Sequence, residues 1–195
     1  MMETKVIRKL YTSSNFIDEQ KFLMEQHKNG WKLKRFSSPV KYTFEKCESE
    51  DYVYQIDFNQ NKKDEKVYIK MFEDCGWEYI QKNSSWFYFR KKRSDIEEEN
   101  NIFSDNVSKA EMCKKVSLKQ SVLAIVILFI DVFWLIFGIP NIKGSVFEIP
   151  AYITGSLIIL ITVFMTMVAA GDIVRLDKMI KEFSNPIEEL EKKEK

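Results

Sequence analysis

An aspartate in the middle of an apolar stretch is the clearest candidate for chemistry in the sequence. Asp131 is the only charged residue in positions 120–142, and a carboxylate inside a membrane span is costly unless it is paired, protonated or facing water. In an antiparallel hairpin its level meets Leu160, which predicts hydrogen bonds to Thr162 or Thr166. The contact either clasps the hairpin or serves another membrane subunit or a protonation-sensitive switch.

A histidine and a cysteine form the second candidate. His27 and Cys75 fall at corresponding helix ends, where an imidazole could activate a thiolate nucleophile. No third group orients the pair, and packing of a helix face explains both residues. The cysteines, Cys47, Cys75 and Cys113, are widely spaced, and the sequence holds neither a metal-ligand cluster nor a glycine-rich phosphate loop. We therefore expect a protein that is not an enzyme and has no cofactor.

The run WFYFRKKR at positions 86–93 combines aromatic rings with cations, as readers of single-stranded nucleic acid do. Aromatic residues that alternate along a strand are more often part of a core. The chain also carries 30 basic and 29 acidic residues, so no global field attracts a polyanion. We do not expect nucleic acid to be the partner.

Two apolar stretches predict a transmembrane hairpin. Residues 123–139 and 149–171 are each long enough to cross about 30 Å of hydrocarbon. Basic residues flank the pair, whereas the connection holds only Lys143; the flanking residues are Lys114, Lys115, Lys119, Arg175, Lys178 and Lys181. Because Lys and Arg near a membrane stay on the cytoplasmic side, we expect a two-pass protein of the cell membrane with both termini in the cytoplasm.

The first half of the chain contains an internal repeat. Gly30-Trp31 aligns with Gly76-Trp77 at an offset of 46 residues. Each copy reads as a strand, a helix that ends at the glycine, and a hairpin opened by the tryptophan, with these four residues framing the core. We therefore predict an α+β fold in which two βαββ units build one mainly antiparallel sheet, with both helices on a single face.

These patterns divide the chain into four parts. Residues 1–93 form the cytoplasmic tandem βαββ domain, and residues 94–118 are an acidic linker that leads into a juxtamembrane helix capped by Ser104 or Asp105. Residues 119–174 form the transmembrane hairpin. Residues 175–195 form a charged helical tail in which Pro186 is expected to end the helix.

Several short motifs occur together in the first 110 residues: NGW at 29–31, KYTFEK at 41–46, YVYQID at 52–57, GW at 76–77, FRK at 89–91 and FSDN at 103–106. With this ordered set the chain resembles the domain-of-unknown-function family number 2812. The resemblance implies a bacterial membrane protein of a kind often encoded beside transcriptional regulators of the PadR type. It supplies no catalytic residues.

Two functions remain open from the sequence. In the first, the chain is a regulatory or sensory module whose cytoplasmic domain binds a protein, such as a PadR-type regulator, or a small ligand, while the hairpin anchors it in the bilayer. In the second, it is an accessory or self-protection protein whose hairpin docks a membrane partner such as an exporter. An enzyme would need a pocket of clustered polar groups.

Overall fold

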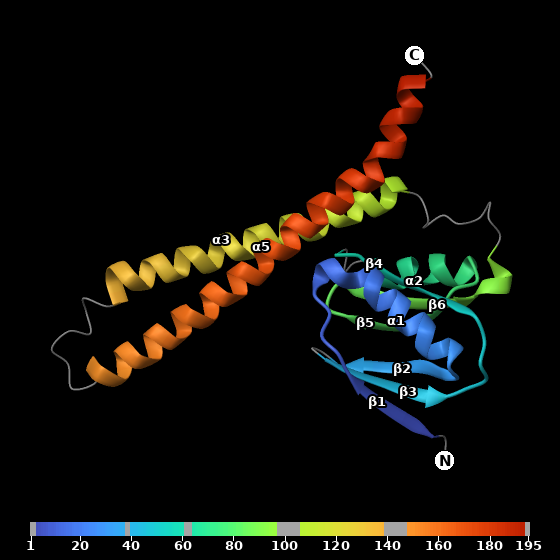
Figure 1. Cartoon of the computed structure of the whole chain (residues 1–195), viewed down its shortest axis with the longest axis horizontal. Coiled ribbons are helices and arrows are strands. Elements are labelled where there is room, and N and C mark those ends of the chain that lie inside the picture. The colour runs from blue at the N-terminus through green and yellow to red at the C-terminus, as the bar shows by residue number, and fades with distance from the viewer. Residues whose placement is uncertain (1–2, 38–39, 61–63, 97–105, 139–147, 194–195) are drawn as a thin grey trace. The chain divides into compact units, whose positions relative to one another are not determined.

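The computed structural model describes residues 3–37, 40–60, 64–96, 106–138 and 148–193 (Figure 1). It divides into two compact units, Met1–Met112 and Cys113–Lys195. The connection between the predicted spans and the proposed cap at Ser104 and Asp105 lie outside the described residues.

The first unit contains two successive βαββ segments, and this order of elements confirms the prediction. The elements of the first segment are β1 (Thr4–Arg8), α1 (Phe16–Lys28), β2 (Trp31–Ser37) and β3 (Lys41–Lys46). Those of the second are β4 (Tyr52–Phe58), α2 (Glu65–Asp74), β5 (Glu78–Asn83) and β6 (Trp86–Lys92). Short 3-10 turns, Ser13–Asn15 and Arg93–Asp95, precede α1 and follow β6.

A glycine at positive φ ends each helix of the first unit. Gly30 has φ +81° and Gly76 has φ +80°, a conformation that side chains with a Cβ rarely adopt. At Gly30 an added Cβ would also meet the Cys47 carbonyl oxygen at 3.1 Å. The helix ends inferred from these glycines are confirmed.

The strands form two antiparallel sheets of three, in the orders β1-β3-β2 and β4-β6-β5, which we call the first and second sheet. The α+β class and the antiparallel pairing are confirmed, whereas the expectation of one continuous sheet is wrong. β2 and β5 each contain a register shift, between Leu33 and Arg35 and between Tyr79 and Gln81. Side chains, not a backbone ladder, join the sheets here: the Phe36 N–H donates to Gln81 Oε1 at 2.8 Å, and Gln81 Nε2 donates to the Phe36 carbonyl at 2.9 Å.

The two helices lie on different faces of the second sheet, so the expectation of both on a single face is also wrong. Phe87 and Phe89 of β6 pack under α2, where Phe72 stacks on Phe89 with ring centroids 3.9 Å apart. The alternate residue Tyr88 points the other way and donates to Glu19 of α1. The second sheet is therefore buried on both faces.

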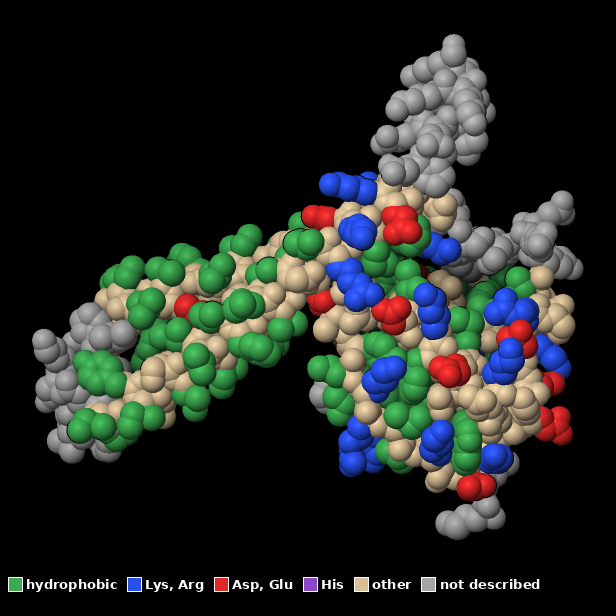
Figure 2. Space-filling view, in the orientation of Figure 1, with side chains coloured by type: hydrophobic (Ala, Val, Ile, Leu, Met, Phe, Trp, Pro, Cys, Tyr) green, Lys and Arg blue, Asp and Glu red, His purple; other side chains and the backbone are tan. Residues whose placement is uncertain are grey.

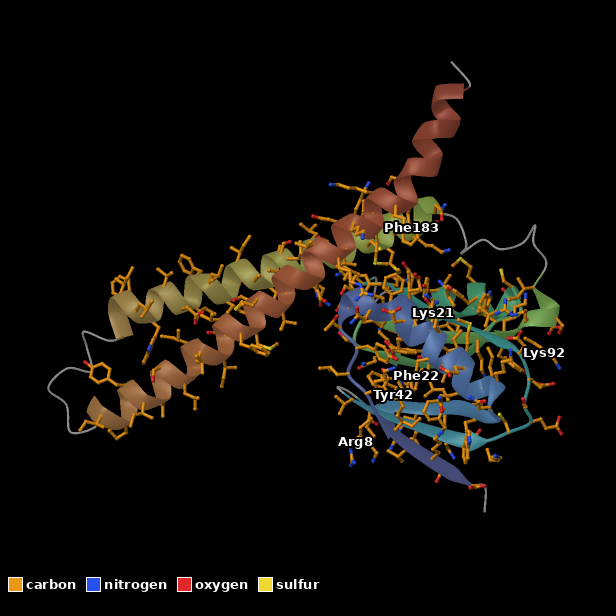
Figure 3. The ribbon with its side chains drawn as sticks, in the orientation of Figure 1. Arg8, Lys21, Phe22, Tyr42, Lys92 and Phe183 are labelled. Atoms are coloured by element: carbon orange, nitrogen blue, oxygen red, sulfur yellow. The ribbon has the colours of Figure 1, made fainter. Side chains whose placement is uncertain are left out.

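α1 lies between the sheets (Figure 1). One side of it packs on the first sheet, where Phe22 contacts Tyr42 edge-to-face at 5.6 Å (Figure 3). The other side meets β4, where Gln20 Nε2 donates to the Tyr54 carbonyl at 2.9 Å. Four α1 residues are buried as a result, Phe16, Glu19, Leu23 and His27.

The second unit is built from two long apolar helices. α3 (Asn106–Phe133) continues into a π-helical turn at Trp134–Gly138, and α5 spans Glu148–Lys193. Segments Ser108–Gly138 and Ile149–Ser184 are long and apolar enough to cross a membrane. Hydrophobic side chains cover their surface (Figure 2).

Polar contacts set the register of this hairpin. Gln120 Nε2 donates to Asp172 Oδ2 at 3.1 Å, and Thr162 Oγ1 donates to Asp131 Oδ1 at 3.0 Å. Partner numbers fall along α5 as they rise along α3, so the helices run antiparallel. The predicted helix end at Pro186 is wrong, because α5 continues to Lys193. A proline removes one backbone hydrogen bond, and a long helix can tolerate that loss with a kink.

Candidate functional site

A cavity of about 170 Å³ opens in the first unit where the N-terminal half of α1 passes between the sheets. Its lining comes from the segment before α1, from α1 itself and from strands of both sheets. The lining residues are Leu10, Tyr11, Thr12, Ser13, Phe16, Glu19, Phe36, Ile56, Asn83, Trp86 and Tyr88. We call this cavity the Glu19 pocket.

A single buried carboxyl group marks the pocket. Glu19 is only 6 % exposed, because the first turns of α1 place it between the two sheets. Tyr42 of β3 donates to Glu19 Oε1 at 2.8 Å, and Tyr88 of β6 donates to the same oxygen at 2.9 Å. Both described hydrogen bonds use Oε1, so Oε2 is left for another partner.

Burial changes the acid–base behaviour of this cluster. Desolvation raises the pKa of Glu19, although the hydrogen bonds from Tyr42 and Tyr88 oppose the shift. Burial and the neighbouring Glu19 carboxyl raise the pKa of Tyr42 and of Tyr88. Both phenols therefore remain O–H donors at neutral pH, and Glu19 is the group whose charge can change.

Aromatic residues make up half of the remaining described lining. Trp86 stacks on Phe16 at 5.8 Å and contacts Phe58 at 5.0 Å. Phe36 lies 5.9 Å from the Tyr88 ring. Rings held from several elements make a wall that is formed before any ligand arrives, as small-molecule sites usually are.

One further polar atom beside the pocket lacks a partner. Tyr11 Oη is buried, and no hydrogen-bond partner for it occurs among the described residues. The Tyr11 ring is fixed by Phe22 at 5.9 Å and by Tyr42 at 6.3 Å. Because a buried hydroxyl without a partner is costly, a bound water or ligand atom would stabilise this arrangement.

The polar groups of the pocket are few. Its described lining offers the Glu19 carboxyl, the phenols of Tyr11 and Tyr88, the hydroxyls of Thr12 and Ser13 and the Asn83 amide. Within the described residues, no group of three or more His, Cys, Asp or Glu side chains is placed to hold a metal ion.

The structure places His27 in a second polar cluster farther along α1. Its ring stacks on Tyr52 at 4.1 Å, and its Nδ1 lies 3.0 Å from Tyr54 Oη. Tyr54 Oη also accepts the Leu33 N–H at 3.2 Å, while Arg90 Nη1 donates to the Leu33 carbonyl at 3.2 Å. Tyr54 and Arg90 thus bond the free edge of β2 at Leu33, and His27 packs between α1 and β4 beside them.

Cys75 and the aromatic run of β6 have other surroundings. Cys75 packs against the core cluster under α2, which includes Phe72 and Trp77. Phe87 and Phe89 are fully buried under that helix, and Tyr88 is buried against α1. None of these three rings is free to stack on a base.

The tryptophans that follow the two glycines differ in burial. Trp77 is buried in the core beneath α2. Trp31 is half-buried, and the ammonium groups of Lys46 and Lys5 lie 4.5 Å and 5.5 Å from its ring. Corresponding positions in the sequence therefore have different roles in the two segments.

In the hairpin, Asp131 is 8 % exposed and its Oδ1 accepts the hydrogen bond from Thr162. Thr166 Oγ1 instead donates to the Val163 carbonyl of its own helix at 2.8 Å. Asp131 Oδ2 is buried without a partner among the described residues. Asp131 also lines a cavity of about 140 Å³, together with Trp134 and Gly155.

The residues that define the Glu19 pocket were not found by sequence reasoning. The available indication was an acid on the buried face of a helix, since Phe16, Glu19, Leu23 and His27 recur at spacings of three or four residues. Tyr42 and Tyr88 come from strands far apart in the chain, and their meeting at Glu19 depends on the stacking of the sheets.

Comparison with known proteins places the chain in a family without a known activity. A family model described as "Protein of unknown function (DUF2812)" matches residues 15–127. The match covers more than half of the chain and runs from α1 into the first apolar helix. No curated protein and no solved structure matches the chain.

Proposed function

The chain belongs to the DUF2812 family, and from that premise we propose that it is a membrane-attached sensory protein that is not an enzyme. Its first unit binds a small ligand in the Glu19 pocket, and its apolar hairpin holds that unit at a bilayer. The observation that carries the proposal is the pocket itself, in which aromatic walls from both sheets surround a buried carboxyl group.

The hairpin supports attachment to a membrane. Its two helices expose large apolar side chains along segments that are long enough to span hydrocarbon. The basic residues that flank the spans, such as Lys115 and Lys178, favour a topology with both termini in the cytoplasm. The family match continues into the first apolar helix, which favours joint function of the two units.

A sensor must pass its ligand state to a partner. α1 contacts both sheets, so a ligand seated against Glu19 would bias the packing of α1 between them. A transcriptional regulator of the PadR type is the partner that the family resemblance suggests.

The ligand-binding part is tested with the full-length chain in detergent micelles. Fractions of a cell extract are screened for those that raise its melting temperature. The Ser13→Trp variant fills the pocket wall, and Ser94→Trp is the matched control in the exposed 3-10 turn after β6. We expect stabilising fractions to fail with Ser13→Trp and to act on Ser94→Trp; equal action on both variants would contradict the proposal.

A second function is favoured by one specific observation. Asp131 Oδ2 is buried without a described partner, as expected of a carboxyl group that awaits a donor from another membrane protein. In this alternative the hairpin docks a partner such as an exporter. Asp131→Leu would then abolish co-purification of that partner, whereas Glu19→Gln would preserve it; the reverse pattern would exclude this alternative.

A further inference from the structure

The charge of the lining residues is the first feature that limits the chemical class of a ligand for the Glu19 pocket. Among the eleven lining residues that the structure describes, Glu19 is the only acid, and Lys, Arg and His are absent from that set. Outside that set, the Lys9 ammonium lies 4.9 Å from the ring of Tyr11. An anionic ligand would therefore meet a carboxyl group without a facing cation.

The aromatic walls also favour a positively charged ligand. Five of the lining residues carry aromatic rings: Tyr11, Phe16, Phe36, Trp86 and Tyr88. The faces of such rings attract cations, most strongly when the site is desolvated. A positive group that approaches Glu19 Oε2 would thus interact with the carboxylate and with the surrounding rings together.

The size of the pocket limits the apolar part of the ligand. A cavity of roughly 150 Å³ is enough to hold a benzene ring, and the Glu19 pocket has about 170 Å³. One ring or a short branched chain, with a single ammonium group, fills this space.

The groups that face Glu19 determine how binding depends on pH. They are the phenols of Tyr42 from β3 and Tyr88 from β6, with Tyr11 beside Tyr42. Burial raises the pKa of the Glu19 carboxyl, which favours its neutral form when no counter-charge is present. A bound cation reverses that preference, so Glu19 loses a proton to solvent as the ion pair forms, while the two phenols continue to donate to Oε1.

We propose that the Glu19 pocket recognises a small organic cation, a primary ammonium attached to one ring or a short apolar chain, with Glu19 as its counter-ion. The inference rests on the proposed ligand-binding function and adds the chemical class of the ligand. It assigns Glu19 the binding role, with Tyr42 and Tyr88 as positioning residues that hold its carboxylate.

The test compares three probes of nearly equal size on the full-length chain in micelles: benzylammonium, the neutral benzyl alcohol and the anionic benzoate. Isothermal titration at pH 7.5 should give benzylammonium at least about tenfold tighter binding than benzyl alcohol, a preference typical of a desolvated cation–π and ion-pair site. Benzoate should bind weakest. In Glu19→Gln the preference for the cation should disappear, whereas Glu45→Gln, on the face of the first sheet that points away from α1, should retain it.

A second measurement on the unaltered chain does not depend on the variant folding. Titrations in buffers of different ionisation enthalpy report protons released on binding. Release is expected with benzylammonium at a pH below the raised pKa of Glu19, and none with benzyl alcohol. Three results would overturn the ligand class. Benzyl alcohol could bind as tightly as benzylammonium or more tightly, Ser13→Trp could leave the binding of benzylammonium intact, or benzylammonium could fail to bind. The pocket function itself fails only if Ser13→Trp leaves every stabilising fraction active.

Discussion

α1 and α2 occupy corresponding positions in the two βαββ segments, yet their surroundings differ. α1 has four buried residues, and two of them, Glu19 and His27, are polar. α2 has one buried residue, Phe72, and exposes Val67 and Met71. The difference arises because α1 contacts both sheets, whereas α2 packs on the second sheet alone within this unit. A helix held between two layers can carry buried polar groups, and these groups form the candidate site.

The same contrast appears in the central strands. Tyr42 and Phe44 of β3 face α1, just as Phe87 and Phe89 of β6 face α2. The intervening residues of β6, Tyr88 and Arg90, are buried, but those of β3, Thr43 and Glu45, are only partly covered. Equivalent alternation in sequence thus leads to different burial, according to whether a second layer covers the strand.

The largest expected effect compares two corresponding apolar positions. Leu23 of α1 is fully buried, and Ile69 of α2 is partly buried. Leu23→Ala should lower the free energy of unfolding by roughly 2–5 kcal/mol, since it leaves a cavity between two layers. Ile69→Ala should lower the free energy of unfolding by a clearly smaller amount. Urea unfolding followed by tryptophan fluorescence measures both, and equal losses would contradict the sandwiched position of α1.

The next effect is a dependence of stability on pH that arises from His27. Burial, reinforced by the Arg90 guanidinium, lowers the pKa of His27 to about 4. An unfolded histidine titrates near 6.5, so the unfolded state binds the extra proton between these values. The contribution of His27 to stability should be constant above about pH 6.5 and should fall towards pH 4 by up to roughly 3 kcal/mol.

Urea unfolding across this range measures the dependence, and His27→Gln should flatten it, since glutamine does not titrate. A variant with the same slope as the parent chain would show that His27 is not buried between the layers.

A smaller effect separates two neighbouring tyrosines. Tyr54→Phe removes the hydroxyl that accepts the Leu33 N–H and contacts His27. It should cost about 1–3 kcal/mol, because a buried donor loses its partner. Tyr52→Phe retains the ring that stacks on His27 and should be nearly neutral. Thermal unfolding of both variants measures this difference. If Tyr54→Phe leaves the stability unchanged, the hydrogen bond between Tyr54 and Leu33 does not stabilise the contact between the sheets.

The smallest effect concerns Glu19 in the absence of ligand. Because burial raises its pKa, the stability associated with its neutral form is present below about pH 4.5 and declines as pH rises through the shifted value. Glu19→Gln should therefore be neutral or stabilising by about 1 kcal/mol at pH 7. Chemical unfolding at pH 5 and 7 measures this, with Glu45→Gln, on the opposite face of the first sheet, as the control. A large loss of stability in Glu19→Gln would show that Glu19 has a structural role.

Sequence patterns predicted the local elements well, because periodicity and glycine stops act over a few residues. The order of strand, helix and hairpin in each segment was predicted, and the helix ends at Gly30 and Gly76 were confirmed. The arrangement of layers was not predicted, since β2 and β5 meet through the Gln81 side chain and no ladder pattern records that contact. Glu19 was overlooked for the same reason: its partners, Tyr42 and Tyr88, are brought together only by the stacking of the two sheets.

Amide hydrogen exchange on the full-length chain, with and without benzylammonium, tests the central claim most directly. The ligand should slow exchange in the first turns of α1, around Glu19, and in β6 around Tyr88, and it should leave α2 unchanged. Protection centred on α2, or no change in α1 at saturating benzylammonium, would contradict a ligand site built on the helix between the sheets.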